Sequence, residues 1–313
     1  MRERAMTLLV GDNPFHGISH LSQERARARS GGQGTEYAEH AAHLVKLALE
    51  NGANGFMFSV DETTLSILEI LSRQNEIENV GLYAIVPYAY EYVRRATLTG
   101  GVFGLAKNLA KEMVFSSNAK VIALNATGLI RFDPSAFLKT YVAYEMSRIK
   151  SAVNRRACLK SILLHEIITD MALALNLDQL VKSYIKLVRK SGIRPGFETR
   201  NFAYLVKKFN EWDIDFNEIN ITASFNKVGF QMCPSKVECE KALKDTFGAE
   251  VIAMSILAAG YLRPKDAIDY VAGLLGISGV VVGVSNEHHS IETFRLLSQI
   301  FNLPKEPEFC CGS

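Results

Sequence analysis

The segment Ser161-Ile-Leu-Leu-His-Glu166 shows the pattern that decides the fold of this chain. A short apolar run ends in two ionisable residues, and a stretch with helical periodicity follows at 177–190. Similar apolar runs that end in polar residues recur along the whole chain, and most of them precede a helix-like stretch. The nine runs are Thr7–Val10, Gly55–Val60, Leu82–Val86, Val121–Leu124, Ser161–Leu164, Pro195–Phe197, Ile219–Ala223, Val251–Ile256 and Gly279–Val284.

Strands that alternate with helices indicate a parallel sheet. Polar residues gathered at the C-terminal ends of such strands indicate an active site at that end of a barrel. We therefore predict an α/β fold, a (β/α)₈ TIM barrel, formed by residues 1–313 as a single domain. Nine runs are one too many for eight strands, so we expect an extra strand or cap element, with 7–10 and 121–124 as the candidates. A doubly wound open sheet is the alternative, although Gly11–His16 lacks its usual glycine-rich turn.

Bulk composition narrows the class of protein. The chain has 313 residues, 48% of them hydrophobic and 22% charged, with a net charge of +2. This charge gives no case for nucleic acid or an anionic membrane as partner. No apolar run approaches the roughly 20 residues of a membrane helix, and the N-terminus does not resemble a signal peptide. Five scattered cysteines are typical of a reducing compartment. We expect a soluble, cytoplasmic protein that acts on a small molecule.

Apolar residues at helical spacing predict six helices, and Ser235 with Glu238 forms a capping-box pattern at the start of one of them. The predicted helices are 36–51, 65–73, 177–190, 235–246, 264–275 and 288–301. Between the first strand and the first helix, residues 21–34 contain a Ser-Gly-Gly-Gln-Gly stretch. We expect this segment to form a flexible loop over the barrel mouth, because glycine-rich, charged segments reorder at little cost.

Candidate site residues in the first half follow the first three strands. Asp12, Asn13 and His16 are candidates for substrate contacts, and the spacing of His16 and His20 leaves a metal site as an alternative. Asp61 either orients a cationic base or caps the following helix. The third strand is followed by Tyr88, a further candidate for substrate contact or proton donation.

In the second half, His165 ends a buried strand, where it would donate to a carbonyl oxygen or shuttle a proton. The alternative for His165 is a satisfied core histidine. Glu198 and Arg200 lie two apart and would share one face of a strand. They form either an ion pair or a carboxylate base beside an anion-binding guanidinium. We expect Glu166 to point to the other side from His165, as a packing or salt-bridge residue instead of a second catalytic group.

A glycine-containing turn follows the last predicted strand and leads into a helix. In barrels of this kind such a turn is the usual phosphate seat. Ser285 and Asn286 would bind a phosphate there, or would only cap the helix. Asn201 and Asn226, which follow two other strands, complete the predicted substrate contacts.

Several of these stretches, in the same order, resemble the aldo/keto reductase superfamily of (β/α)₈ barrels, which mostly transfer a hydride from a nicotinamide cofactor to a carbonyl. The resemblance covers residues 160–300 well and the first 160 poorly. The stretches are Phe58–Asp61, Leu163–His165, Thr199–Phe202, Ile219–Asn226, Ile252–Leu262 and Val281–Ser285 with Glu292. The resemblance implies a catalytic role for Asp61 and His165 and an NAD(P) cofactor held near Ser285, Asn286 and Glu292.

The chain departs from the family pattern at the catalytic centre. Ser66 stands where the family has its catalytic tyrosine, and Val86-Pro87-Tyr88 carries no lysine where the family has one. Met254 replaces an aromatic residue that often stacks on the nicotinamide. The start of the final helix, residues 286–289, offers Asn, Glu and two His but no Lys or Arg to hold a 2′-phosphate. The resemblance therefore indicates a divergent member.

Three functions are compatible with these residues. The first is an enzyme with Asp61, His165 and Glu198 as catalytic groups, acting on a small carbonyl or phosphorylated metabolite as a nicotinamide-dependent oxidoreductase with a non-standard site. The second is a lyase, isomerase or hydrolase assisted by a divalent metal, with His16, His20, Asp61, His165 or Glu198 as ligands. The third is a non-catalytic binding or regulatory barrel.

Overall fold

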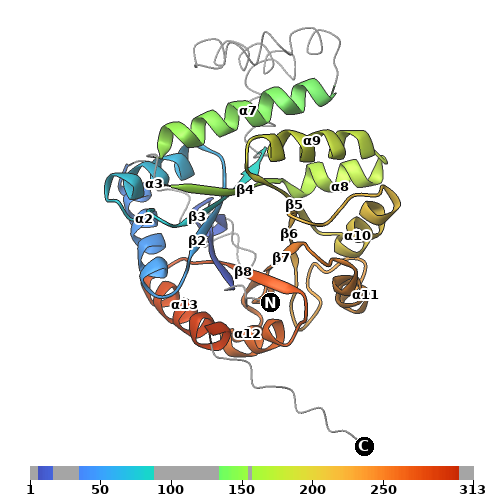
Figure 1. The fold of residues 1–313 in the computed structure, drawn as a ribbon. Coiled ribbons are helices and arrows are strands. Elements are labelled where there is room, and N and C mark those ends of the chain that lie inside the picture. The colour runs from blue at the N-terminus through green and yellow to red at the C-terminus, as the bar shows by residue number, and fades with distance from the viewer. Residues whose placement is uncertain (1–5, 17–34, 88–133, 154–156, 303–313) are drawn as a thin grey trace, which may run out of the picture.

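The computed structural model describes residues 6–16, 35–87, 134–153 and 157–302. In this part of the chain eight strands pair in sequence order and close into a parallel barrel, with the helices packed around it (Figure 1). The predicted TIM barrel is therefore confirmed. The strands are β1 (Thr7–Gly11), β2 (Gly55–Ser59), β3 (Gly81–Val86), β4 (Cys158–Leu164), β5 (Arg194–Thr199), β6 (Asn220–Ser224), β7 (Glu250–Met254) and β8 (Ile277–Gly283).

Closure of the barrel shows whether the run at 7–10 is a barrel strand or an extra element. β1 pairs with both β2 and β8, with Thr7 opposite Gly279 and Gly11 opposite Gly283, so residues 7–10 belong to the barrel. The run at 121–124, and with it the predicted extra element, lies outside the described residues, as does the predicted loop 21–34. A closed barrel also rules out the doubly wound open sheet.

The helices largely follow the apolar periodicity of the sequence. The predicted helix 235–246 is shorter than expected, because the α-helix ends at Ala242 and a 3₁₀ turn, Leu243–Asp245, continues it. Three further helices, α7, α8 and α10, were not among those predicted. The helices are α2 (Thr35–Glu50), α3 (Glu62–Arg73), α7 (Pro134–Ala152), α8 (Glu166–Ala174), α9 (Asp178–Lys190), α10 (Phe202–Glu211), α11 (Lys236–Ala242), α12 (Pro264–Ala272) and α13 (Glu287–Asn302).

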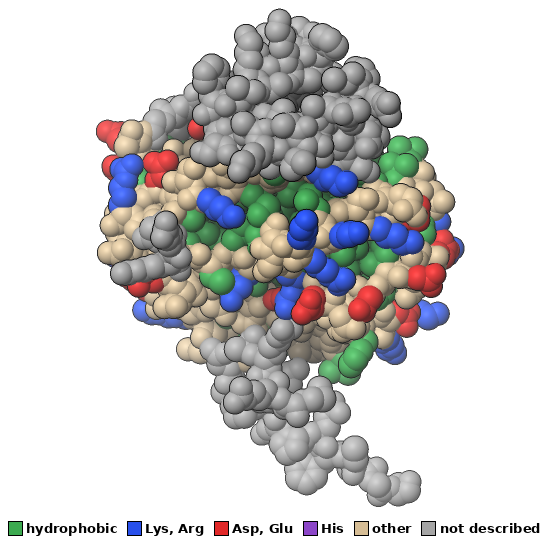
Figure 2. All heavy atoms as spheres, turned by 45° about the horizontal axis from the view of Figure 1, so that its top comes forward, with side chains coloured by type: hydrophobic (Ala, Val, Ile, Leu, Met, Phe, Trp, Pro, Cys, Tyr) green, Lys and Arg blue, Asp and Glu red, His purple; other side chains and the backbone are tan. Residues whose placement is uncertain are grey.

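Within the described ranges, none of these helices is both long and apolar enough to cross a bilayer. Charged side chains of both signs are interspersed on the face shown in Figure 2, as the small net charge requires.

The apolar core has two layers, because alternate residues of each strand point to opposite faces of the sheet. The larger layer lies between the sheet and the helices and includes Ile221 and Ala223 of β6. The smaller layer fills the barrel interior, where it consists of Leu9, Met57, Tyr83, Ile85, Leu163 and Ile252, with Val281 packed against them.

On β6 the interior face is polar instead of apolar. Asn220, Thr222 and Ser224 alternate with the outward-facing Ile221 and Ala223, and all three are at most 2% exposed. One polar atom of each side chain, Nδ2, Oγ1 and Oγ respectively, has no hydrogen-bond partner in the described part of the protein. A buried polar group without a partner costs free energy. The interior face of β6 is therefore polar from one end of the barrel to the other, without being fully satisfied.

Glycines allow the closest approaches between strands. A Cβ atom on Gly55 would lie 2.6 Å from the Gly81 carbonyl oxygen and 2.5 Å from Leu9 Cδ2. The Gly81 oxygen belongs to the backbone of β3 and cannot move aside without disturbing the sheet. Gly55 is therefore a packing requirement of the β1–β2–β3 contact.

We expect Gly55→Ala to lower the free energy of unfolding by about 2 kcal/mol or more, because overpacking a barrel strand displaces backbone. Urea denaturation of the purified variant measures this loss. Gly273→Ala is the matched control: a Cβ there meets nothing closer than 3.5 Å, so its effect should stay within about 0.5 kcal/mol. Equal effects of the two substitutions would contradict the packing argument.

Candidate functional site

A charged triad occupies the C-terminal end of β1 and β2. His16, in the 3₁₀ turn Asn13–His16 after β1, places Nε2 3.0 Å from Asp12 Oδ2 and Nδ1 3.1 Å from Asp61 Oδ2. The side chains of His16 and Asp12 are only 6% and 5% exposed. Asp12 Oδ2 also accepts the Ser59 N–H at 2.6 Å. Each ring nitrogen of His16 thus faces a carboxylate, which suits an imidazolium with two donors.

Asp61 has both functions that the sequence left open. It caps α3 by accepting the Thr64 N–H at 2.8 Å, and the Thr64 side chain completes the capping box. The same carboxylate contacts His16 through its other oxygen. Asp61 is therefore a helix cap that also fixes the orientation of a buried cation.

Opposing effects set the pKa of each partner. Burial alone would lower the pKa of His16, but its hydrogen bonds to Asp12 and Asp61 and their negative charges raise it to about 10. Burial alone would raise the pKa of Asp61, but the hydrogen bond and the positive charge of His16 hold the pKa of that carboxyl below its usual value. At neutral pH His16 is therefore a cation between two carboxylates.

His165 lies at the end of β4 as the N-cap of α8. Its backbone N–H bonds the Val86 carbonyl of β3 at 2.9 Å, and its Nδ1 accepts the Ile167 N–H at 3.2 Å. Burial lowers its pKa, although the charges of Glu166 and Asp12 oppose the shift. A neutral ring whose Nδ1 is an acceptor carries its proton on Nε2. Backbone contacts thus determine the tautomer of His165.

Glu198 and Glu166, although close together, differ in their partners. Arg200 Nε donates to Glu166 Oε2 at 2.6 Å, so the predicted Glu198–Arg200 ion pair is wrong. The β5–α10 turn directs Arg200 towards α8, where Glu166 forms the salt bridge expected of it. Glu198 Oε2 instead accepts the Glu166 N–H at 3.3 Å, beside His165.

The pKa of Glu198 is raised to about 8, first by burial and then by the negative charges of Glu166 and Asp12, against the smaller opposing effects of the Glu166 N–H and of Arg200. The negative charge of Asp12 also raises the pKa of His165, against the effect of burial. The mouth therefore brings together Asp12, His165 and Glu198, from strands far apart in the sequence.

Asp170 is a half-buried residue with several polar contacts that sequence reasoning missed. It lies on α8, accepts from Thr199 Oγ1 at 2.5 Å and from the Arg200 N–H at 3.3 Å, and contacts Asn201 Nδ2 at 3.4 Å. Asn201 is thus held against α8 behind the strand. The signal available in the sequence was the spacing of four between Glu166 and Asp170, which places both on one helix face.

Some predicted substrate contacts have other roles or locations. Asn226 is fully buried, and its amide bonds the Phe230 backbone in both directions at 2.8 Å. Asn226 therefore holds the loop after β6 instead of contacting substrate, because its Nδ2 and Oδ1 both bond the Phe230 backbone. Asn13 is exposed in the turn after β1. His20 and Tyr88 lie outside the described residues.

At the β8–α13 turn, Asn286 Oδ1 accepts the His289 N–H at 2.8 Å and so caps α13. Glu292 lies on the exposed side of α13, 3.0 Å from His288 Nε2, and Glu287 lies 3.3 Å from His43. The side chain of Ser285 is half-buried beside them. The charged partners at this helix end are therefore acidic residues and histidines.

Metal binding has no support in this geometry. No group of three or more His, Cys, Asp or Glu residues in the described ranges could hold a metal ion. His16, the central candidate, directs both ring nitrogens at carboxylates instead of a shared cavity.

Known proteins resemble this chain in structure but not detectably in sequence. No protein-family model and no curated protein matches it. A protein from Pseudomonas aeruginosa that is assigned as an aldo-keto reductase superposes with a TM-score of 0.57 at 13% identity, over 95% of this chain and 91% of that one. The aldose reductase from Schistosoma japonicum gives a TM-score of 0.51 at 11% identity, over 95% and 86% of the two chains.

The fold is that of an aldo-keto reductase-like barrel. In this barrel Ser66, five residues after Asp61, is exposed on α3, where its hydroxyl donates to the Glu62 carbonyl at 2.8 Å. It therefore does not point into the mouth.

The raised pKa of His16 predicts a pH-dependent stability. Because a raised histidine pKa favours the folded state below the unfolded pKa of about 6.5, this stabilisation should be lost as the pH rises towards 10. The difference in free energy of unfolding between wild type and His16→Asn should shrink across this range by a few kcal/mol. Guanidinium denaturation at pH 6, 8 and 9.5 measures it.

His288→Asn is the matched control, since His288 also lies near a carboxylate but is 71% exposed; its effect should not vary strongly with pH. If the difference between wild type and His16→Asn were the same at pH 6 and 9.5, the buried imidazolium would be excluded.

Proposed function

We propose that this protein is an enzyme that transfers a proton to the oxygen of a small carbonyl compound during its reduction. The observation that carries the proposal is the pairing of two groups in the mouth. His165 has a neutral ring with its proton on Nε2, and Glu198, beside the first turn of α8, has a pKa of about 8. Perturbed titratable groups at the C-terminal end of a barrel are typical of active sites.

His165 would polarise the carbonyl. Its Nδ1 is held by the Ile167 N–H and its backbone by β3, so the ring cannot turn freely. An Nε2–H donor directed at the carbonyl oxygen stabilises the negative charge that develops there. The low pKa of His165 keeps the ring neutral, and a neutral ring is a donor of fixed direction.

Glu198 would supply the proton. A carboxyl with a pKa of about 8 is largely protonated at neutral pH and matches the range in which general acids are effective. It takes the role that the missing tyrosine would have, without needing a neighbouring lysine. Asp12, which contacts His16, lies near these groups, and its negative charge raises the pKa of Glu198 and so favours the protonated form.

A nicotinamide, when bound, supplies the hydride that adds to the carbonyl carbon. The residues fit an NADH-type cofactor better than NADPH. Ser285 and the first turn of α13 would hold its phosphates, since helix N-termini bind anions. The described charged residues at this turn, Glu287 and Glu292 with their histidine partners, offer no Lys or Arg for a 2′-phosphate. The buried Ser224 hydroxyl, which has no partner within the described residues, would bind the carboxamide.

We expect the turnover number for carbonyl reduction to fall above pH 8, because ionised Glu198 cannot donate a proton. For the reverse reaction, alcohol oxidation, the turnover number should instead rise above pH 8, since this reaction needs ionised Glu198 as the proton acceptor. Glu198→Gln should lower turnover by about 10²–10⁴-fold and remove the inflection near pH 8. A panel of small aldehydes and ketones, assayed with NADH from pH 6 to 9.5, provides the measurement.

The control is Glu69→Gln, an exposed glutamate on α3 that pairs with Arg73. This variant should keep both the rate and the pH profile. Retention of the inflection near pH 8 in Glu198→Gln would assign the proton donor to another group.

The acidic residues near the N-terminus of α13 predict that the protein prefers NADH to NADPH. NADH should raise the melting temperature more than NADPH does, because two glutamates at α13 repel a 2′-phosphate. Glu292→Lys should narrow this difference by providing a cation, whereas Lys241→Ala on α11 should not change it. Differential scanning fluorimetry with each cofactor tests the expectation; tighter binding of NADPH by the wild type would contradict it.

A further inference from the structure

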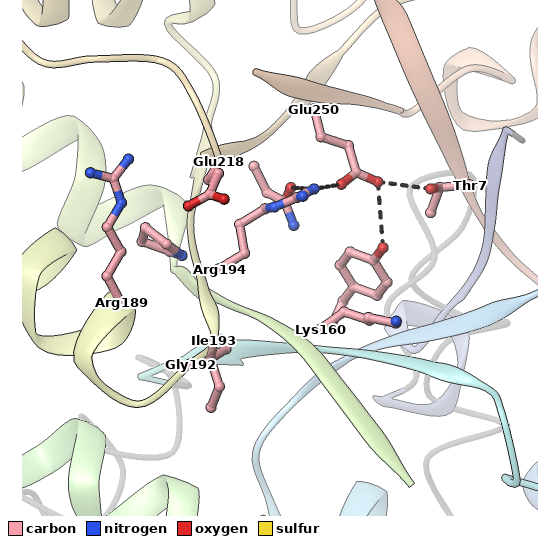
Figure 3. Close-up of a pocket in the computed structure, with 11 residues that line it drawn as sticks. Thr7, Lys160, Arg189, Gly192, Ile193, Arg194, Glu218 and Glu250 are labelled. Atoms are coloured by element: carbon pink, nitrogen blue, oxygen red, sulfur yellow. Dashed lines mark hydrogen bonds and ion pairs between the residues drawn. The ribbon is translucent and has the colours of Figure 1, made fainter. Parts of the chain in front are cut away.

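A polar pocket lies at the opposite end of the barrel from the candidate active site. Its volume is about 480 Å³, within the range of small-molecule sites. The first residues of β1, β5, β6 and β7 line it: Thr7, Arg194, Asn220 and Glu250. Figure 3 shows Arg194 between Arg189 on one side and Lys160 on the other. The proposed mechanism uses none of these residues.

One ion-pair network forms the floor of this pocket. Glu250, 7% exposed, accepts from Thr7 Oγ1 at 2.7 Å and from the Tyr83 hydroxyl at 3.4 Å, and pairs with Arg194. Arg194 and Glu250 thus neutralise one another. Of the other charged lining residues, Lys160 and Arg189 are positive and Glu218 is negative. The pocket therefore has a net positive charge of about one.

Asn220 provides a buried donor without an acceptor. It is fully buried and lines the pocket, and its Oδ1 accepts from Arg194 at 3.4 Å. Its Nδ2 has no partner in the described part of the protein. Such an orphaned N–H is costly unless water or a ligand accepts it.

A β-bulge positions the second donor. β3 and β4 pair Leu82 with Leu159 and Tyr83 with Ser161, so Lys160 is the extra residue. Bulges re-aim side chains and often lie next to sites. Lys160 lines the pocket, and its ammonium makes no hydrogen bond or ion pair with any residue that the structure describes. The bulge thus places a cation with unused donors in the pocket that the Asn220 amide also lines.

We propose that this pocket binds a small organic anion, with its carboxylate or phosphate oxygens accepting from Lys160 Nζ and Asn220 Nδ2. An anion would accept a hydrogen bond from Asn220 Nδ2 and would also offset the excess positive charge of the lining. A neutral ligand would satisfy only the amide, and a cation would be repelled by Lys160 and Arg189. The site is independent of the proposed reaction at the other end of the barrel.

Binding of inorganic phosphate and of succinate, measured by calorimetry at constant ionic strength with glycerol as the neutral comparison, tests this proposal. Lys160→Ala should weaken anion binding about tenfold, because it removes a charged donor. Glu218→Gln should tighten it about threefold, because it removes a negative charge from the lining. Lys241→Ala, an exposed substitution on α11 outside the pocket, is the matched control and should change nothing.

Binding of phosphate alone would assign a phosphate ester to the site, and binding of succinate alone a carboxylate. Lys160→Arg should restore affinity, which excludes a purely structural effect of Lys160→Ala. The proposal is overturned if neither anion binds at millimolar concentration, or if both charge variants bind like the wild type. If both charge variants bound the anions like the wild type, the anion site would lie elsewhere, for example at the N-terminus of α13.

Discussion

The hydrogen-bonded closure of β1 against β8 is the constraint on which the rest of the structure depends. The register that sets Thr7 opposite Gly279 and Gly11 opposite Gly283 completes a barrel with no free edge. Once the sheet is closed, all eight strands deliver their C-terminal residues to one rim. Asp12, Asp61, His165 and Glu198 meet for this reason, although nearly 190 residues separate the first from the last. The same closure brings Thr7, Arg194 and Glu250 together at the opposite rim.

Charge is distributed unevenly within the mouth. His16 is compensated twice, by Asp12 and Asp61, and this compensation outweighs the cost of burying an imidazolium. Glu198 receives less compensation, because the Arg200 guanidinium bonds Glu166 instead and, among the described residues, only the Glu166 N–H donates to Glu198. Burial and neighbouring carboxylates then favour its protonated form. One barrel end thus holds a histidine cation at neutral pH, a second histidine with a lowered pKa and a carboxyl with a raised pKa, and the proposed proton transfer rests on this combination.

The interior face of β6 connects the two ends of the barrel. Asn220, Thr222 and Ser224 place polar atoms without a partner among the described residues in an interior that other strands fill with Leu, Met and Ile. At the upper end Ser224 adjoins the proposed cofactor site, and at the lower end Asn220 lines the anion pocket. Polar residues kept in an otherwise apolar interior are costly, and such exceptions are expected at functional sites. The two proposed sites therefore use opposite ends of one strand.

The sequence by itself determined the alternation of strands and helices that favours a barrel and most of the helices, because apolar periodicity reports which face of each element is buried. It offered nine runs for eight strands, and only closure of the sheet showed that residues 7–10 belong to the barrel. It also identified the ionisable residues after each strand, including Asp61, His165 and Glu198. Only the tertiary structure decided how these residues pair. Arg200 is two residues from Glu198 in the chain, yet it bonds Glu166 on another element, and Asn226 turns into its own loop. Asp170, Asn220 and the bulge at Lys160 likewise acquire their roles from neighbours on other strands and helices. Pairing depends on distances across the barrel and on desolvation, and neither quantity is encoded in the local pattern of residues.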